Sequence, residues 1–268
     1  MKICKSENNE FILINGDTHK VLDNLKNRLK VDCVLTSPPY NNSRNNKNLK
    51  NHEGRYDVYL DQKSNKEYLK WIMDIFNKID YLLNENGVIL WNISYGTENP
   101  NVFFEFPYYL IHNTNFMIAD IIIWKKNSAL PNNVSKNKLT RIVEYVYVIC
   151  RKDEYNFFNC NKKVKSVSKT GQNYYENIFN FIQAPNNDGS NNLNKATYSI
   201  DLCKQLLNMY CKSGNKILDI FNGTGTTGNA CLELGMKYIG IELSENQFNY
   251  SNDRLLKKLG EINNNENL

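Results

Sequence analysis

Short apolar runs alternate along this chain with longer stretches whose apolar residues recur at helical spacing. The runs predict strands at 11–15, 31–35, 88–93, 118–125, 141–149, 216–221 and 237–241. The longer stretches predict helices at 18–25, 67–83, 102–112, 197–210 and 229–235, with Pro107 interrupting the third. Because no helix separates 118–125 from 141–149, these two strands are expected to form an antiparallel hairpin. Asn86-Gly87 is expected to turn the chain into the strand 88–93, and the polar ends before residue 11 and after Leu259 are expected to be loose.

The strand at 31–35 is followed by Thr36-Ser37-Pro38-Pro39-Tyr40-Asn41. Two consecutive prolines lack backbone donors and fix φ, so the strand must end in a stiff corner. Such a corner presents a hydroxyl group, carbonyl oxygens and an aromatic face. A planar ring that carries an amino group would fit there, although an ordinary proline turn explains the same residues.

A second strand, 216–221, ends in a glycine-rich turn, Asn222-Gly223-Thr224-Gly225-Thr226-Thr227-Gly228. A helical segment and another strand follow, which together make a βαβ unit with Glu242 at the tip of its second strand. Gly223 and Gly225 allow the backbone to approach a ligand closely, and Glu242 is placed to accept hydrogen bonds from two ribose hydroxyls. The turn departs from G-x-G-x-x-G and has no lysine after its glycines, which argues against a dinucleotide site and a P-loop.

These motifs resemble those of the amino-group DNA methyltransferases. Ser37-Pro38-Pro39-Tyr40 looks like their catalytic motif, and the segment from Asp219 to Thr227 looks like their S-adenosylmethionine motif. Asn194-Lys195-Ala196-Thr197-Tyr198 resembles the short motif that precedes the cofactor motif in permuted members. The catalytic motif comes first, which is the order of the β group. The resemblance covers roughly residues 10 to 250.

The resemblance implies an α/β fold of the class I methyltransferase, Rossmann-like kind: a doubly wound, mostly parallel, seven-stranded sheet with an antiparallel hairpin and a small DNA-recognition insertion. It implies one methyltransferase domain at 10–250, S-adenosylmethionine as cofactor, double-stranded DNA as substrate, and a flipped target base. The implied catalytic residues are Ser37, Pro38, Pro39 and Tyr40. The cofactor residues are expected to be Asp17, Thr36, Lys195, Ala196, Thr197, Asp219, Phe221, Asn222, Gly223, Gly225, Thr226, Thr227 and Glu242.

Asp17 has two interpretations. It stands at a strand-to-helix junction, where an aspartate commonly caps the helix N-terminus. The permuted family pattern implies instead a hydrogen bond from Asp17 to the cofactor adenine. Both roles can hold at once.

The first residue of the catalytic motif bears on the target base. An aspartate there resembles most adenine-specific members, whereas Ser37 resembles the cytosine-specific ones. A serine hydroxyl can also donate to cytosine N3 while the Pro38 carbonyl accepts an amino hydrogen. The expected product is therefore N4-methylcytosine, with N6-methyladenine open because the width of the pocket also selects the base.

Two segments have the composition of DNA-contacting surfaces. Residues 41–66 lack any hydrophobic period and leave directly from the corner, so a mobile lid over DNA that includes Arg44 and Arg55 is expected. Residues 151–192 interleave lysines with aromatic residues and are expected to read the target, with Lys162, Lys163 and Lys165 on DNA. A disordered insertion and a solvated connector are the alternatives.

The composition agrees with a globular protein of 268 residues that has a net charge of +5. Seven scattered cysteines without a C-x-x-C pair, and only three histidines, predict reduced thiols, a cytoplasmic location and no metal. No signal peptide or long apolar run is present, so no membrane association is expected. A cognate restriction endonuclease is a candidate partner, and the chain is expected to be a monomer or a homodimer. An RNA or protein methyltransferase, or a nucleotide-binding module without catalysis, are the competing functions.

Overall fold

A computed structural model describes residues 2–41, 63–95, 99–129, 131–189 and 197–266. Within them a sheet of nine strands has the order β1-β2-β11-β10-β3-β4-β6-β5-β9. Its strands are β1 (Lys2–Lys5), β2 (Phe11–Asn15), β3 (Val31–Thr36), β4 (Leu83–Ile93), β5 (Phe116–Lys126), β6 (Val143–Arg151), β9 (Phe181–Ala184), β10 (Lys216–Asp219) and β11 (Lys237–Glu242). The central pairs from β2 to β4 are parallel, whereas β6 is antiparallel to both β4 and β5. The predicted hairpin is therefore confirmed.

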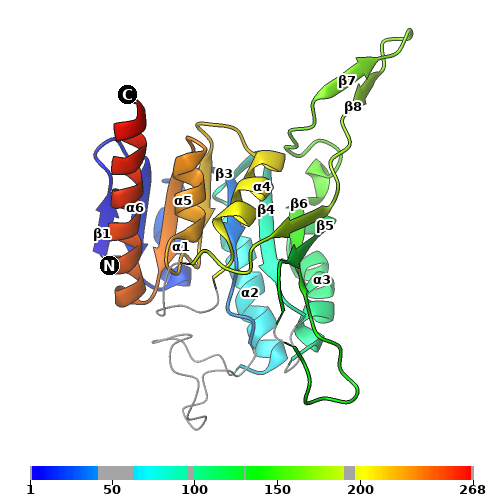
Figure 1. Ribbon diagram of the computed structural model, residues 1–268, viewed down its shortest axis with the longest axis horizontal. Helices are drawn as coiled ribbons and strands as arrows, with labels where there is room; N and C mark the ends of the chain where they lie inside the picture. The colour runs from blue at the N-terminus through cyan, green and yellow to red at the C-terminus, as the bar shows by residue number, and fades with distance from the viewer. Residues whose placement is uncertain (1, 42–62, 96–98, 130, 190–196, 267–268) are drawn as a thin grey trace.

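Helices cover both faces of the sheet (Figure 1). One face carries α1 (Thr18–Leu25), α2 (Asn65–Asp80) and α3 (Asn101–Asn113), and the other carries α4 (Ile200–Tyr210), α5 (Thr226–Glu233) and α6 (Glu245–Glu266). Each face has its own apolar cluster, one built around the α2 and α3 side chains and the other around those of α4 and α6. The alternation of parallel strands with helices on opposite faces is the doubly wound arrangement that the motifs imply.

The sheet has two more strands than expected, and they lie at its edges. Residues 2–5, predicted to be a loose lead-in, form β1 antiparallel to β2. Beyond the hairpin, β9 adds to β5 in parallel. The exposed pattern of β1 carries little apolar signal, because an edge strand buries few side chains.

Three boundaries also differ from the sequence prediction. The C-terminal helix α6 continues past Leu259 because Leu259 and Ile262 pack against the second apolar cluster. Pro107 does not interrupt α3: the Phe103 carbonyl, which a residue at 107 would normally bond, accepts from Tyr147 Oη at 3.1 Å instead. Asn86, with a φ of 58°, lies inside β4 at a register shift against β3 rather than in a turn before the strand.

A separate two-stranded sheet, β7 (Val164–Val167) paired antiparallel with β8 (Asn173–Tyr175), lies within the predicted recognition segment. It follows the short helix η1 (Lys152–Glu154) and projects outward from the body of the molecule (Figure 1). All seven of its strand residues are exposed. No helix of the described ranges is both long and apolar enough to cross a membrane.

Candidate active site

The two motifs meet at the carboxyl ends of neighbouring strands. The corner follows β3 and the glycine turn follows β10, and these strands pair in parallel. The chain leaves β10 towards β11 through α5, and it leaves β3 towards β4 through α2 on the opposite face. This is a topological switch point, where open α/β sheets form their ligand crevice.

Asp219 joins the two motifs. Its Oδ1 accepts from Thr36 Oγ1 at 2.7 Å and from the Phe221 N–H at 3.1 Å. Its Oδ2 accepts from Thr227 Oγ1 at 2.7 Å, and the Tyr198 hydroxyl lies 3.5 Å away. Burial raises the pKa of Asp219, although these hydrogen bonds act in the opposite direction. Thr36, Asp219 and Thr227 are thus buried behind the turn and hold its geometry.

The glycine turn is fixed by Glu242. The carboxylate accepts the Gly223 N–H at 2.7 Å with one oxygen and the Ser244 N–H at 2.8 Å with the other. Gly225 is in the left-handed region with a φ of 82°, and a Cβ there would come within 2.5 Å of Ser251 Oγ. Glycine is therefore required at 225 by both backbone and space. Asn222 is buried and accepts the Tyr238 hydroxyl at 2.8 Å.

Aromatic side chains lie beside this turn. The Phe221 ring centroid is 5.8 Å from that of Trp71 and 6.4 Å from that of Trp91. Asp17 caps α1 by accepting the Lys20 N–H at 3.2 Å, so the capping interpretation is confirmed. Thr18 Oγ1 donates to the Ile220 carbonyl at 2.8 Å, which fastens the start of α1 to the end of β10.

In the proline corner, the carbonyl groups differ. Tyr68 Oη donates to the Pro39 carbonyl at 2.7 Å. Among the described residues, no group donates to the Pro38 carbonyl, so it can accept from a ligand. Ser37 Oγ lies 2.9 Å from Tyr40 Oη. The corner therefore offers a serine hydroxyl and one carbonyl oxygen together.

Sequence reasoning missed the residues that surround Tyr40. Asn92 Nδ2 donates to Tyr40 Oη at 2.7 Å, and Glu144 Oε2 lies 3.4 Å from the same oxygen. Lys126 pairs with the other Glu144 oxygen at 2.6 Å. A signal was present, because Glu144 is the one acid inside the apolar run 141–149.

The segment before α4 is tied to the cofactor turn through Asp188, a second residue that the motifs did not indicate. Its carboxylate accepts from Thr226 Oγ1 at 2.5 Å, from Thr197 Oγ1 at 3.2 Å and from Arg254 Nη1 at 2.7 Å. Thr197 and Thr226 are thereby brought together as expected. Four other predicted site residues lie outside the described ranges: Arg44, Arg55, Lys195 and Ala196.

Lys162, Lys163 and Lys165 lie apart from the corner, near the amino end of β4, whereas the corner lies near its carboxyl end. Just before them, the Asn159 N–H donates to the Asn86 carbonyl near the beginning of β4. Asn92 is six residues further along that strand, about 20 Å away at ~3.3 Å per residue. The three lysines and the corner therefore do not share one surface patch.

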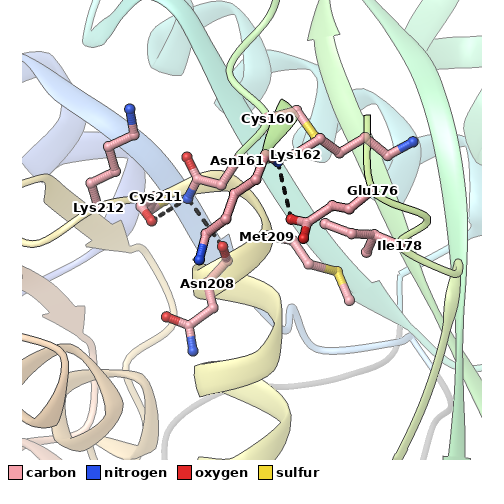
Figure 2. Close-up of a pocket in the computed structure, with 10 residues that line it drawn as sticks. Cys160, Asn161, Lys162, Glu176, Ile178, Asn208, Met209, Cys211 and Lys212 are labelled. Atoms are coloured by element: carbon pink, nitrogen blue, oxygen red, sulfur yellow. Dashed lines mark hydrogen bonds between the residues drawn. The ribbon is translucent and has the colours of Figure 1, made fainter. Parts of the chain in front are cut away.

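A pocket at the base of the β7–β8 hairpin contains Lys162 and Lys163 (Figure 2). Asn161 fastens this base to the end of α4, because its N–H donates to the Met209 carbonyl at 2.8 Å and its Nδ2 donates to the Asn208 carbonyl at 3.0 Å. Glu176 accepts the Lys163 N–H at 3.0 Å. No cluster of metal-ligating side chains occurs in the part of the chain that the structure describes.

A family model described as DNA methylase, covering N6- and N4-methylating enzymes, matches residues 31–253. This chain belongs to that DNA methylase family. Over 278 residues it is 24% identical to the Type II methyltransferase M.SmaI of Serratia marcescens, covering 92% of this chain and 91% of that one. It is 22% identical over 285 residues to M.Cfr9I of Citrobacter freundii, covering 93% and 89%.

Solved structures show the same fold. PvuII DNA methyltransferase (cytosine-N4-specific) superposes with a TM-score of 0.66 at 17% identity, covering 95% of this chain and 93% of that one. M1.HpyAVI gives a TM-score of 0.60 at 23% identity, covering 91% and 98%. By its family the chain is thus an S-adenosylmethionine-dependent DNA amino-methyltransferase, and DNA is its substrate.

Proposed function

We propose that this methylase transfers the methyl group to N4 of cytosine. The observation that carries the proposal is the hydroxyl of Ser37, rather than a carboxylate, at the open end of the corner. The similarly folded PvuII DNA methyltransferase is cytosine-N4-specific, which supports the same assignment. N6 of adenine is the second candidate, because the Pro38 carbonyl and Ser37 would suit either amino group.

The chemistry at the corner follows from its acceptors. A base amine is a poor nucleophile because its lone pair is delocalised into the ring. Hydrogen bonds from its N–H groups to Ser37 Oγ and the Pro38 carbonyl favour a tetrahedral nitrogen and stabilise the positive charge that develops there. Tyr40 adds stacking and a cation–π interaction. Pro38 and Pro39 keep these groups in place before the base arrives.

The glycine turn fits S-adenosylmethionine by its own chemistry. The Glu242 carboxylate, whose two oxygens hold the Gly223 and Ser244 N–H groups, is the acceptor that we assign to the ribose hydroxyls. Phe221 offers a ring face for the adenine, and Asp17 stands beside the turn. We assign Thr36, Asp219, Asn222 and Thr227 to shaping the turn, and Gly223, Gly225, Thr226, Thr197, Lys195 and Ala196 to the cofactor itself. When bound, this cofactor supplies an activated methyl group on a sulfonium.

The proposed organisation follows the sequence prediction. Residues 10–250 form the methyltransferase domain, 41–66 cover DNA with Arg44 and Arg55, and 151–192 contribute to target recognition. The relatives are named Type II methyltransferases, which supports a cognate restriction endonuclease as partner. A cytoplasmic enzyme that acts as a monomer or homodimer is consistent with that role.

The test measures single-turnover transfer of labelled methyl groups to unmethylated DNA, followed by digestion and mass spectrometry of the nucleosides. N4-methylcytosine is the expected product, and N6-methyladenine alone would contradict the proposal. Ser37→Ala should lower the rate about 10²-fold or more because one amine acceptor is lost. Cofactor affinity by calorimetry should not change. Ser213→Ala, in the exposed turn before β10, removes the same hydroxyl away from the corner and is the matched control. Labelled transfer to RNA under the same conditions tests the competing substrate.

A further inference from the structure

The Tyr40 hydroxyl is the centre of a hydrogen-bond network that spans three strands. Ser37 Oγ lies 2.9 Å from Tyr40 Oη on one side. On the other side, Asn92 Nδ2 donates to Oη at 2.7 Å and to Glu144 Oε2 at 3.0 Å. Oη itself is 3.4 Å from Glu144 Oε2. The network therefore links the catalytic motif after β3 to single residues of β4 and β6.

Glu144 is held in this position from behind. Lys126 Nζ donates to Oε1 at 2.6 Å, and only 14% of the Glu144 side chain is exposed. Lys126 also lies over the Trp124 ring, with Nζ 4.9 Å from its centroid. Because Oε1 is occupied by the ammonium group, Oε2 faces Asn92 and Tyr40.

The chemistry of these groups sets the direction of each hydrogen bond. A carboxylate can only accept, and the Asn92 amide nitrogen can only donate. Tyr40 has one proton, which Glu144 Oε2 attracts, while its oxygen accepts from Asn92. With the Tyr40 proton on Glu144, Ser37 is the donor in its pair with Tyr40, and both Ser37 lone pairs are left for the substrate.

We infer that Glu144 is a positioning residue for the methyl acceptor, which acts through Tyr40 to turn the Ser37 oxygen towards the target amine. The inference rests on the proposed role of the corner. It divides the two amino hydrogens between Ser37 Oγ and the Pro38 carbonyl, and it leaves no Ser37 proton for the ring nitrogen. Glu144 takes no part in bond making. Its negative charge, one hydrogen bond beyond Tyr40, also favours the positive charge that develops on nitrogen.

The first experiment replaces the carboxylate by an amide of the same length. In Glu144→Gln the new Nε2 can donate to Tyr40, so the Tyr40 proton turns to Ser37 and occupies one of its lone pairs. Single-turnover methyl transfer at saturating DNA and cofactor is expected to fall about 10²-fold. Cofactor affinity should not change, whereas the melting temperature should fall because Lys126 loses its carboxylate partner, so the rates are compared below the unfolding transition. Glu85→Gln, an exposed acid near the beginning of β4, loses the same charge and should keep the wild-type rate.

A double-mutant cycle separates positioning from a merely structural role. If Glu144 acts through the Tyr40 hydroxyl, Glu144→Gln should cost nothing further in a Tyr40→Phe background. Effects that multiply, or a wild-type rate in Glu144→Gln, would overturn the inference. If Glu144→Gln fails to fold, Glu144→Asp is the alternative variant. It keeps the negative charge, but its side chain is one methylene shorter, so the carboxylate lies further from Tyr40. It is expected to be slower than wild type and again to add nothing to Tyr40→Phe, and a multiplicative loss would count against the inference.

Ser37→Ala distinguishes failure of the inference from failure of the proposed function. A fully active Ser37→Ala would remove the corner from catalysis and the inference with it. An inactive Ser37→Ala, together with an undisturbed Glu144→Gln, would leave the corner catalytic and overturn the positioning role alone.

Discussion

At the scale of single residues, Glu242 combines two tasks on one carboxylate. It holds the glycine turn through the Gly223 and Ser244 N–H groups, and it is also the residue proposed to bind the ribose of the cofactor. A neutral residue at this position would loosen the turn and lose the ribose contacts together. Asp219 likewise uses one carboxylate for two contacts, because its hydrogen bonds to Thr36 and Thr227 join the catalytic and cofactor motifs.

Glu242→Ala should therefore weaken cofactor binding. Each hydrogen bond lost from the charged group is worth about 1.5–3 kcal/mol, so the dissociation constant should rise at least about tenfold. Calorimetric titration with the cofactor measures it. Glu245→Ala, an exposed acid at the start of α6, is the control. An unchanged affinity in Glu242→Ala would remove this residue from the site.

At the scale of elements, the β7–β8 hairpin is separated from the chemistry by the length of a strand. The hairpin follows β6, which runs antiparallel to β4. Because of this direction, β6 ends beside the amino end of β4, away from the corner. Exposed Tyr174 and Tyr175 lie on the same hairpin. A DNA contact made by the hairpin would therefore lie away from the proline corner.

Replacing Lys162, Lys163 and Lys165 together by alanine should flatten the salt dependence of DNA binding. The slope of log K against log salt should lessen by about 0.9 for each lysine that contacts a phosphate. Because these lysines lie far from Ser37, single-turnover transfer at saturating DNA should persist. Alanine at the exposed Lys5, Lys237 and Lys257 removes the same charge elsewhere. An unaltered slope in the first variant would assign its lysines to bulk solvent.

At the scale of the whole molecule, Arg151 joins three elements near the beginning of β4, at the end of the strands away from the active site. Its Nε donates to Asp80 Oδ1 at 2.6 Å at the end of α2, and Nη1 donates to the Asn84 carbonyl and Glu154 Oε1, both at 3.0 Å. Nη2 donates to the Asp80 and Leu83 carbonyls at 2.9 Å and 2.8 Å. One guanidinium thus fastens β6, β4 and α2 together.

Arg151→Lys should lower the stability of the fold, because an ammonium group cannot reproduce the planar fork of donors. Arg151 donates five hydrogen bonds and an ammonium group has only three donors, so at least two bonds are lost, at about 1.5–3 kcal/mol each. Urea unfolding measures the loss, and Arg28→Lys, in the exposed turn that follows α1, is the same change without buried partners. Methyl transfer below the unfolding transition should be retained. Equal stability of the two variants would contradict the proposed fastening role.

The apolar periodicity alone determined most strands and helices, because it reports which faces of an element are buried. It also located both motifs at strand ends, where parallel strands bring them to one edge. Only the tertiary structure showed that Glu144 lies beside Tyr40, from which it is 104 residues away in the sequence. The reason is that the antiparallel register decides which residue of β6 lies opposite the end of β4. The edge strands β1 and β9 and the position of the β7–β8 hairpin could likewise be seen only in the tertiary structure. Exposed residues show no hydrophobic periodicity, so their sequence does not indicate which elements they pack against.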